Sequence, residues 1–398
     1  MYHRWAGIAT AVHATIHLYG ETHDWIIQHQ VALEFTNTRI QVGLVAWLSL
    51  CLVFFTSLGF IRRNFFEVFY YAHALVIAFI VGALIHAEHA PEFLLPGLCL
   101  WFVDRLTRFV HNFRPVDVVS ATTCPGGVIK FKLHGVRPRH PGQIVWVQFP
   151  AVSFFDWHPF TIASAPDNNE TTLLLKGLGS YTRQIQELIT EKENRDIPAE
   201  SLPLKIRIDG PYGIGHIRWG IHPVTILVAG GAGITPGISI ASHIIQQASR
   251  ADVEITRGQT WNVHLLWMVR HQEHARWFSG ELAQLSDIAS RPELPATLDI
   301  TIAITGIPIP RDSAPQPDEV STTRDSHTGG DVVGQAHFIY GRPNISQYFQ
   351  AISNRYRGMD AAVNVCGPRP LIWSVRRAAA KWSGQNVIFD VEEEVFEF

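Results

Sequence analysis

Histidines in the apolar first third of the chain are the residues whose type and position could carry redox chemistry. They are His3, His13, His17, His73 and His86. A neutral imidazole is a common axial ligand of haem iron, and an ionisable group at membrane depth marks a functional site by default. Structural histidines that are hydrogen-bonded between helices would explain these residues about equally well. The residue types alone leave both interpretations open.

The spacing of these histidines restricts which of them could form pairs. His3 and His17 are 14 residues apart, which is about 21 Å along a helix and within about 40° of one face. His73 and His86 are 13 residues apart, about 20 Å along a straight helix but rotated by about 220°. A bulged turn or a different direction of approach is then needed, and spacing does not choose between them. If the two helices run in the same direction, His3 pairs with His73 and His17 with His86, and each pair could hold one b-type haem.

A glycine-rich turn after a buried-type strand at 224–229 could bind a phosphate. Its residues are Gly230, Gly231, Ala232, Gly233, Ile234, Thr235 and Pro236. Without Cβ atoms the backbone can approach a pyrophosphate, and a helix N-terminus favours negative charge. An ordinary strand-to-helix turn explains such a segment as well. The segment Cys366-Gly367-Pro368 after a predicted strand at 362–366 favours a nucleotide site, because nucleotides bind at the carboxyl ends of parallel strands.

The histidines lie in segments that predict membrane helices. Residues 40–61 and 68–87 contain no Asp, Glu, Lys or Arg, and each run can cross a hydrocarbon core of about 30 Å. Residues 5–20 and 93–103 are weaker candidates, for which a buried or interfacial helix is the alternative. A cleaved signal peptide is a further alternative for the first of these. The sequence therefore predicts a helical membrane domain with about four crossings in residues 1–113.

Loop charges predict the orientation of this domain. With four crossings, six arginines fall on one side: Arg4, Arg62, Arg63, Arg105, Arg108 and Arg114. The other side carries Arg39 together with acidic residues and histidines: Glu21, His23, Asp24, Glu88, His89 and Glu92. Positive residues stay on the cytosolic side. We therefore expect the rest of the chain in the cytosol and an acidic face outside, where these six residues could hold a ferric ion; a solvated acidic loop is the plainer alternative.

After residue 114 the pattern changes to that of two soluble domains. Residues 128–133 and 143–149 are typical of strands, and an antiparallel barrel of about 100 residues fits them. We assign this barrel to residues 114–216. Residues 217–398 alternate strand, turn and helix, with strands predicted at 224–229, 263–269, 298–304 and 362–366. This alternation predicts a doubly wound parallel sheet.

Composition excludes several classes of function. Residues 306–335 are rich in Pro, Ser, Thr, Asp and Gly and predict a disordered insertion. A net charge of −3 provides no broad basic field for nucleic acid. The four cysteines are far apart without a C-x-x-C pair, so a disulfide framework or a cysteine zinc site is not expected.

Several motifs in the soluble half resemble the ferric reductase and NADPH oxidase superfamily, and the resemblance covers nearly the whole chain. The segment His158-Pro159-Phe160-Thr161 with Ile162, Ala163 and Ser164 resembles its flavin-binding motif. Gly179-Ser180-Tyr181-Thr182 resembles the segment that meets the FAD pyrophosphate, and Gly210-Pro211-Tyr212-Gly213 the turn that closes the flavin barrel. The resemblance implies an FAD site in this barrel.

The nucleotide motifs resemble the same family. Residues 230–236 and Cys366-Gly367-Pro368 resemble its two nicotinamide-nucleotide motifs. Arg270 and Arg342 lie where the family selects the 2′-phosphate of NADPH, and guanidinium groups pair well with phosphate. The resemblance implies that Cys366 flanks the nicotinamide and that Phe398, the terminal aromatic residue, covers the flavin ring.

The membrane half resembles the third, fifth and sixth helices of the family. Residues 3–17, 66–86 and 101–105 carry this likeness, which implies that His3, His17, His73 and His86 ligate the iron of two b-type haems. His13 would then be a hydrogen-bonding neighbour. The family core has six crossings, so we expect the first two to be missing from this sequence, through truncation or because the protein works without them.

The resemblance implies transmembrane electron transfer from NADPH through FAD and two haems. The ending of the chain looks closest to fungal metalloreductases, so the expected acceptor is a ferric or cupric chelate in iron uptake at the plasma membrane. The alternatives are an NADPH oxidase that produces superoxide, and a truncated relic that binds FAD and NADPH without transfer. Membrane lipid is an expected partner and nucleic acid is not. An iron permease or oxidase partner cannot be identified from the sequence.

Overall fold

The computed structural model describes residues 2–112, 115–166, 168–177, 179–193, 205–250, 260–306, 336–384 and 387–394. These residues divide into two units, 1–109 and 110–398. Of the predicted insertion at 306–335, only residue 306 is among the described residues. The terminal Phe398 lies outside them.

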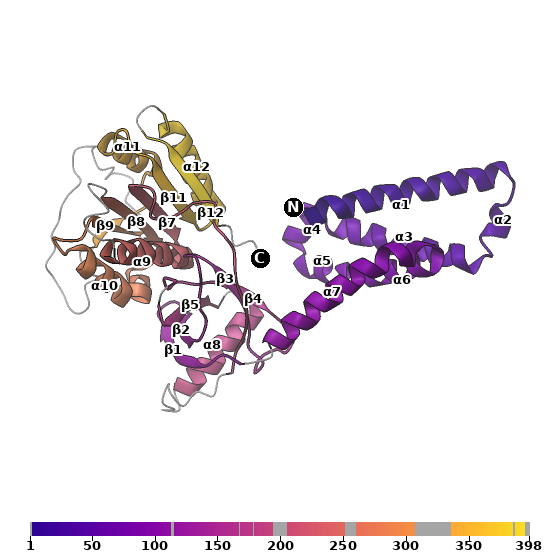
Figure 1. Cartoon of the computed structure of the whole chain (residues 1–398), viewed down its shortest axis with the longest axis horizontal. Helices are drawn as coiled ribbons and strands as arrows, with labels where there is room; N and C mark the ends of the chain where they lie inside the picture. Colours follow the sequence, from indigo (N-terminus) through magenta and orange to yellow (C-terminus); the bar gives the residue numbers. More distant parts are fainter. Residues whose placement is uncertain are drawn as a thin grey trace. The chain divides into compact units, whose positions relative to one another are not determined.

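The first unit is helical, as Figure 1 shows. Its helices are α1 (Tyr2–Ile27), α2 (Val31–Glu34), α3 (Thr38–Thr56), α4 (Gly59–Asn64), α5 (Phe66–His73), α6 (Val76–His86) and α7 (Ala90–Asn112), the last of which continues into the second unit. Two segments are long and apolar enough to cross a membrane: Thr38–Thr56 has a mean hydropathy of 1.7, and Phe66–His86 has one of 2.2. Both match predicted crossings. The weaker candidates, 5–20 and 93–103, lie inside α1 and α7.

The segment Phe66–His86 is interrupted in its middle, between α5 and α6. Ala74, Leu75 and Ile77 donate their backbone N–H groups to carbonyls three residues earlier, at distances of 3.0–3.2 Å. Such bonds are those of a 3₁₀ turn, which is wound more tightly than an α-helix. The interruption supplies extra rotation between His73 and His86. It is a tightened turn and not the bulged turn that was one of the two geometries left open by spacing.

Within the second unit, two three-stranded antiparallel sheets form the barrel. Their strands are β1 (Val118–Cys124), β2 (Val128–His134) and β5 (Glu170–Lys176), and β3 (Ile144–Gln148), β4 (His158–Thr161) and β6 (Arg207–Tyr212). Isolated bridges from Val116 to Ile206 and from Ile162 to Leu173 join the two sheets. The helix α8 (Ser180–Glu193) packs against the barrel through Tyr181, Ile185 and Ile189, which are all buried.

The rest of this unit is a six-stranded parallel sheet in the order β10-β9-β8-β7-β11-β12. The strands are β7 (Val224–Gly230), β8 (Trp261–Val269), β9 (Ala296–Ile304), β10 (His337–Tyr340), β11 (Ala361–Cys366) and β12 (Phe389–Glu394). The helices are α9 (Ile234–Arg250), α10 (Ser279–Ala289), α11 (Ile345–Arg355) and α12 (Arg369–Trp382).

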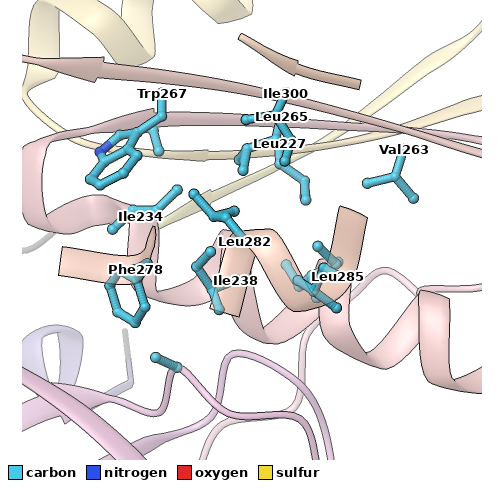
Figure 2. Close-up of a cluster of buried hydrophobic side chains, with 14 of the residues drawn as sticks. Leu227, Ile234, Ile238, Val263, Leu265, Trp267, Phe278, Leu282, Leu285 and Ile300 are labelled. Carbon is cyan, nitrogen blue, oxygen red and sulfur yellow. The ribbon is translucent and has the colours of Figure 1, made fainter. Parts of the chain in front are cut away.

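Helices cover both faces of this sheet. Figure 2 shows Leu227, Leu265 and Ile300 on one face against Ile234 and Ile238 of α9 and Leu282 and Leu285 of α10. Buried residues of β7 and β11 on the other face pack with those of α11 and α12. The predicted fold class is therefore confirmed: a helical unit, an antiparallel barrel and a doubly wound parallel sheet.

Candidate functional site: paired histidines and a nucleotide-binding edge

The four predicted haem ligands form the two pairs that their order along the helices indicates. The rings of His3 and His73 face each other with centroids 6.1 Å apart, and those of His17 and His86 with centroids 6.2 Å apart. The planes within the pairs are inclined by 70° and 65°. An imidazole nitrogen binds a transition metal at about 2 Å, so two rings on opposite sides of one ion have centroids about 6 Å apart. Both pairs fit a single iron between them.

Hydrogen bonding at these pairs also suits a bound metal group. The Nδ1 atom of His86 donates to the backbone carbonyl of Arg39 at 2.9 Å, which leaves Nε2 free of its proton and available as a ligand. The Nδ1 atom of His73 is buried without a hydrogen-bond partner among the described residues. A buried polar atom without a partner is costly in a finished fold, so this nitrogen fits a site that is completed by a bound group.

Gly43 is a residue of this site that sequence reasoning missed. A Cβ atom at Gly43 would lie 2.5 Å from Nδ1 of His86, closer than real contacts allow. A Cβ at Gly82 would likewise lie 2.7 Å from Cβ of Ala46, so α3 and α6 approach closely. The available signal was a glycine inside an otherwise bulky apolar run, where it usually marks close helix packing.

The other histidines of this unit do not join the pairs. Nδ1 of His13 donates to the carbonyl of Ala9 on its own helix at 2.7 Å. The predicted outer iron site is not supported: His89 lies 3.0 Å from Glu92 and His23 lies 3.6 Å from Asp24. Across the described residues, no three His, Cys, Asp or Glu side chains gather closely enough to hold a metal. Glu21, Asp24 and Glu92 instead each lie near a different histidine, with Glu21 3.9 Å from His17.

The predicted flavin motif lies on β4, whose residues pair antiparallel with β3: Phe160 lies opposite Val145, and Pro159 opposite Trp146. His158 stacks on Tyr181 with ring centroids 4.2 Å apart, and burial lowers the pKa of His158. Thr161 is buried, and its Oγ1 has no hydrogen-bond partner among the described residues. This unpaired hydroxyl is the observation that fits a bound flavin, whose ring carries polar atoms that could accept its proton.

The start of α8 lies beside this strand. Gly179 and Ser180 are exposed at the helix N-terminus, and the backbone N–H of Gly179 donates to Oγ1 of Thr182 at 3.0 Å. Tyr181 accepts a hydrogen bond from the N–H of Phe149 at 2.9 Å and donates to the carbonyl of Asp156 at 3.3 Å. Because a helix N-terminus attracts anions, these residues are suited to a pyrophosphate. Tyr181 itself was missed as a positioning residue.

The two nucleotide motifs meet at the switch point of the parallel sheet. The chain runs from β7 outward through β8, β9 and β10, and then returns to β11 on the other side of β7. The turns after β7 and β11 are therefore neighbours. Ligands of such sheets bind in the crevice at this point, outside the carboxyl ends of the strands.

The glycines of the turn after β7 have different roles. A Cβ at Gly233 would lie 2.4 Å from the carbonyl oxygen of Cys366, and one at Gly230 would lie 2.8 Å from Cδ of Pro368. A Cβ at Gly367 would lie 3.2 Å from Cα of Gly230. These three glycines let the two turns touch. Gly231, with a φ of 57°, faces open space and is the position where a nucleotide can approach.

Thr235 and Pro236 lie in the first turn of α9 and are both buried. Oγ1 of Thr235 donates to the carbonyl of Ala232 at 3.3 Å. Their side chains therefore fix the start of the helix. They can contribute to nucleotide binding only indirectly, by positioning that helix N-terminus.

Arg270 and Arg342 lie at the same edge of the sheet. Arg270 follows β8, Arg342 follows β10, and β9 lies between these strands. Both residues are exposed. Neighbouring strands are about 4.8 Å apart, so the two backbones leave the edge about 10 Å from each other. Two guanidiniums at this spacing could share one phosphate.

Cys366 ends β11 beside the acidic strand β12. Burial and the nearby carboxyl of Glu394 raise the pKa of Cys366, so its side chain is a thiol and not a thiolate. Burial also raises the pKa of Glu394 to about 8, although Asn364 donates to its Oε1 at 3.2 Å. Sequence reasoning identified Cys366 but missed Glu394 and Asn364, because their strand position gives no local signal.

Known protein families match three consecutive parts of the chain. The ferric reductase like transmembrane component matches residues 1–84, an FAD-binding domain matches residues 113–216, and the ferric reductase NAD binding domain matches residues 222–380. The chain belongs to the ferric reductase and NADPH oxidase superfamily.

Relatives within this superfamily include both kinds of enzyme. The chain is 31% identical over 303 residues to ferric reduction oxidase 7, chloroplastic, of Arabidopsis thaliana, a match that covers 72% of this chain and 39% of the relative. It is 28% identical over 368 residues to a superoxide-generating NADPH oxidase heavy chain of Dictyostelium discoideum, covering 89% of this chain and 69% of the relative. The chain thus spans from about two fifths to about two thirds of the length of these two relatives.

A solved ferredoxin NADP+ reductase from Neisseria gonorrhoeae, with bound FAD and NADP, resembles the chain with a TM-score of 0.45 and 13% identity, over 70% of this chain and 98% of that one. The family matches themselves show that the chain contains an FAD-binding domain, a ferric reductase NAD binding domain and a segment that matches the ferric reductase like transmembrane component.

Proposed function

We propose that this chain transfers electrons from cytosolic NADPH, through FAD and two b-type haems, across a membrane to an external ferric or cupric chelate. The observation that carries the proposal is the pair of facing imidazoles at each of two levels, with centroids 6.1 and 6.2 Å apart, in a chain whose other domains bind FAD and NAD. FAD, when bound, accepts a hydride from NADPH and releases electrons singly, which haem requires.

We assign the topology from the helices and their flanking charges. In this proposal α1, α3, the interrupted segment α5–α6 and α7 cross the bilayer, and the arginines near their cytosolic ends fix the orientation. His3 and His73 then form the inner level and His17 and His86 the outer level. We further propose that it is a multi-pass protein of the plasma membrane with its FAD and NADPH domains in the cytosol.

The chain's own residues position the cofactor and the substrate. Thr161 offers its hydroxyl proton to the flavin, and the N-terminus of α8 binds the FAD pyrophosphate. Gly231 leaves room for the NADPH pyrophosphate, while Arg270 and Arg342 select its 2′-phosphate. Cys366 lies beside the nicotinamide.

Haem content of single histidine variants tests the proposal. We expect His73→Ala to lose the inner haem and His86→Ala the outer one, so that each variant retains about half of the haem of the wild type. His13→Ala is the matched control on α1, because its ring is bonded within its own helix, and should keep both haems. The readout is the reduced-minus-oxidised spectrum with a haem-to-protein ratio. A wild-type spectrum without a bis-histidine b-type band would refute the transmembrane path and support a relic that only binds nucleotides.

The acceptor is tested separately, because the relatives include ferric reduction oxidases and a superoxide-generating oxidase. We favour a metal chelate because the 31% identical relative is a ferric reduction oxidase. Membranes that carry the chain should reduce ferric citrate at the same rate with and without superoxide dismutase. If the dismutase abolishes the NADPH-driven reduction, the product is superoxide and the chain is an NADPH oxidase.

A further inference from the structure

The loop between β3 and β4 carries two aromatic side chains that are exposed to solvent. Phe154 is 50% exposed and Phe155 is 86% exposed. Their rings touch edge to face with centroids 5.6 Å apart. Exposure of two adjacent phenylalanine rings to water is unfavourable, because burial of their apolar surface would lower the free energy. The flavin barrel has a filled core that does not need them.

The loop is held in place, so the exposure is a property of the fold. The side-chain amide of Gln148 donates to the carbonyl of Phe154. The hydroxyl of Tyr181 bonds to the loop at both ends, at Phe149 and at Asp156. Oγ of Ser153 accepts from the N–H groups of Phe155 and Asp156 at 3.4 Å. These hydrogen bonds tie the backbone of the loop to β3 and α8.

A positive charge accompanies the two rings. The guanidinium of Arg207 lies over the Phe154 ring, 4.8 Å from its centroid, and donates to Oε1 of Gln148 at 3.3 Å. An aromatic tip beside a cation is the combination that the membrane interface favours, because rings settle at headgroup level and cations are drawn to lipid phosphates.

Chain connectivity brings this loop near the end of α7. Val116 follows Asn112, the last residue of α7, by four residues, so their Cα atoms are at most about 14 Å apart. The N–H of Val116 donates to the carbonyl of Ile206 at 2.8 Å. Arg207 follows Ile206 and lies in register with Gln148, after which the aromatic loop begins. The entry from the last predicted crossing and the aromatic loop are therefore at one end of the barrel.

We propose that the Phe154–Phe155 loop is an interfacial anchor that inserts its two rings among the lipid headgroups beside the bilayer, with Arg207 next to the phosphates. This inference rests on the topology in the proposed function, in which α7 crosses the membrane. The anchor holds the barrel end that carries β4, and with it the flavin motif, at the membrane surface.

Photo-cross-linking of the full chain in nanodiscs tests the anchor. The nanodiscs contain phosphatidylcholine and phosphatidylserine, and p-benzoylphenylalanine replaces Phe155 in one variant. The same probe replaces Trp373, an exposed aromatic residue of α12, in a matched control. Mass spectrometry of the irradiated peptides identifies what each probe has captured. We expect a lipid adduct at position 155 at a yield at least tenfold higher than at position 373.

A third variant separates failure of the anchor from failure of the topology. The probe in place of Phe102 of α7 should capture lipid if α7 is in the bilayer. Lipid capture at 102 with a peptide cross-link, an FAD adduct or no adduct at 155 would overturn the anchor and leave the proposed topology standing. The absence of lipid capture at both positions would overturn both.

Discussion

At the scale of single residues, Gly43 determines whether the outer histidine pair can form. We expect Gly43→Ala to push the His86 ring aside, because the new Cβ would lie 2.5 Å from its Nδ1. The haem-to-protein ratio should fall by about half. A redox titration should show that only one of the two haems, identified by its midpoint potential, is lost. Gly7→Ala on α1 is the control, since nothing lies within 4 Å of a Cβ there. Equal haem content in both variants would contradict the assigned outer pair.

Glu394 predicts a pH dependence of stability. Burial raises its folded-state pKa to about 8 from an unfolded value of 4.5. Between these values the unfolded chain releases a proton that the folded chain keeps, so stability is lost as pH rises from about 4.5 to 8. Glu394→Gln removes this loss.

The measurement is the melting temperature of the second unit in the purified chain at pH 5 and pH 8. We expect the variant to gain stability over the wild type at pH 8 and little or nothing at pH 5. Asp390→Asn, at an exposed position of the same strand, should show no such difference. A gain that is equal at both pH values would show that Glu394 does not titrate in this range.

At the scale of elements, the contact between the turns after β7 and β11 explains why similar glycines should respond differently. Gly233→Ala places a Cβ 2.4 Å from a backbone oxygen, which cannot move aside. We expect a loss of about 1–3 kcal/mol in the free energy of unfolding. Gly231→Ala meets open space and should cost about 1 kcal/mol, for its positive φ.

Kinetics complete this comparison. Gly231→Ala should raise KM for NADPH severalfold while the melting temperature changes little, because the new methyl group lies where the nucleotide approaches. Gly233→Ala should lower the melting temperature by more. The reverse order of the two melting temperatures would show that the glycines were assigned to the wrong roles.

The sequence predicted those elements whose side chains repeat with a clear period. Strands β3, β7, β8 and β11 were found because each is largely apolar, and β2 and β9 were found because apolar and polar residues alternate in them. Strands β10 and β12 were missed. β10 has four residues, and β12 carries Asp390 and three consecutive glutamates. Its acidic residues are tolerated because Arg376 pairs with Glu393 at 2.9 Å and because burial keeps Glu394 protonated.

The pairing of the histidines could be predicted from helix direction, whereas its geometry could not. A straight helix puts His73 and His86 on different faces, and the residues around Ala74 and Leu75 include neither proline nor glycine to signal an interruption. Likewise, Gly43 and Tyr181 act through contacts with residues that are distant in sequence, and a single sequence does not display such contacts. The outer acidic site was not supported among the described residues, where the plainer alternative of a solvated acidic loop fits better, because composition does not tell whether charged residues converge or pair locally.

At the scale of the whole molecule, the proposal predicts vectorial transfer. In sealed vesicles with the cytosolic face inward, NADPH enclosed in the lumen should reduce external ferricyanide, which cannot cross the membrane. NADPH added outside should not support this reaction. Permeabilisation with a mild detergent should then make added NADPH effective. Reduction by external NADPH in tight vesicles would reverse the orientation that the arginine distribution indicates.

The interruption at Ala74 and Leu75 has a consequence for how the two histidine-bearing helices can vary. Three 3₁₀ steps rise about 2.0 Å each in place of 1.5 Å, so the 13-residue span from His73 to His86 reaches about 21 Å. That is the rise of the 14-residue span from His3 to His17 on α1. The tighter winding also brings the rotation of the two spans to within about 40° of each other. The break therefore compensates for the one-residue difference between the two spans, so that both helices hold their histidines at the same two levels. Insertion of one residue at the break would add about 1.5–2 Å of rise and about 100–120° of rotation, so it should separate His86 from His17 and lower the haem content.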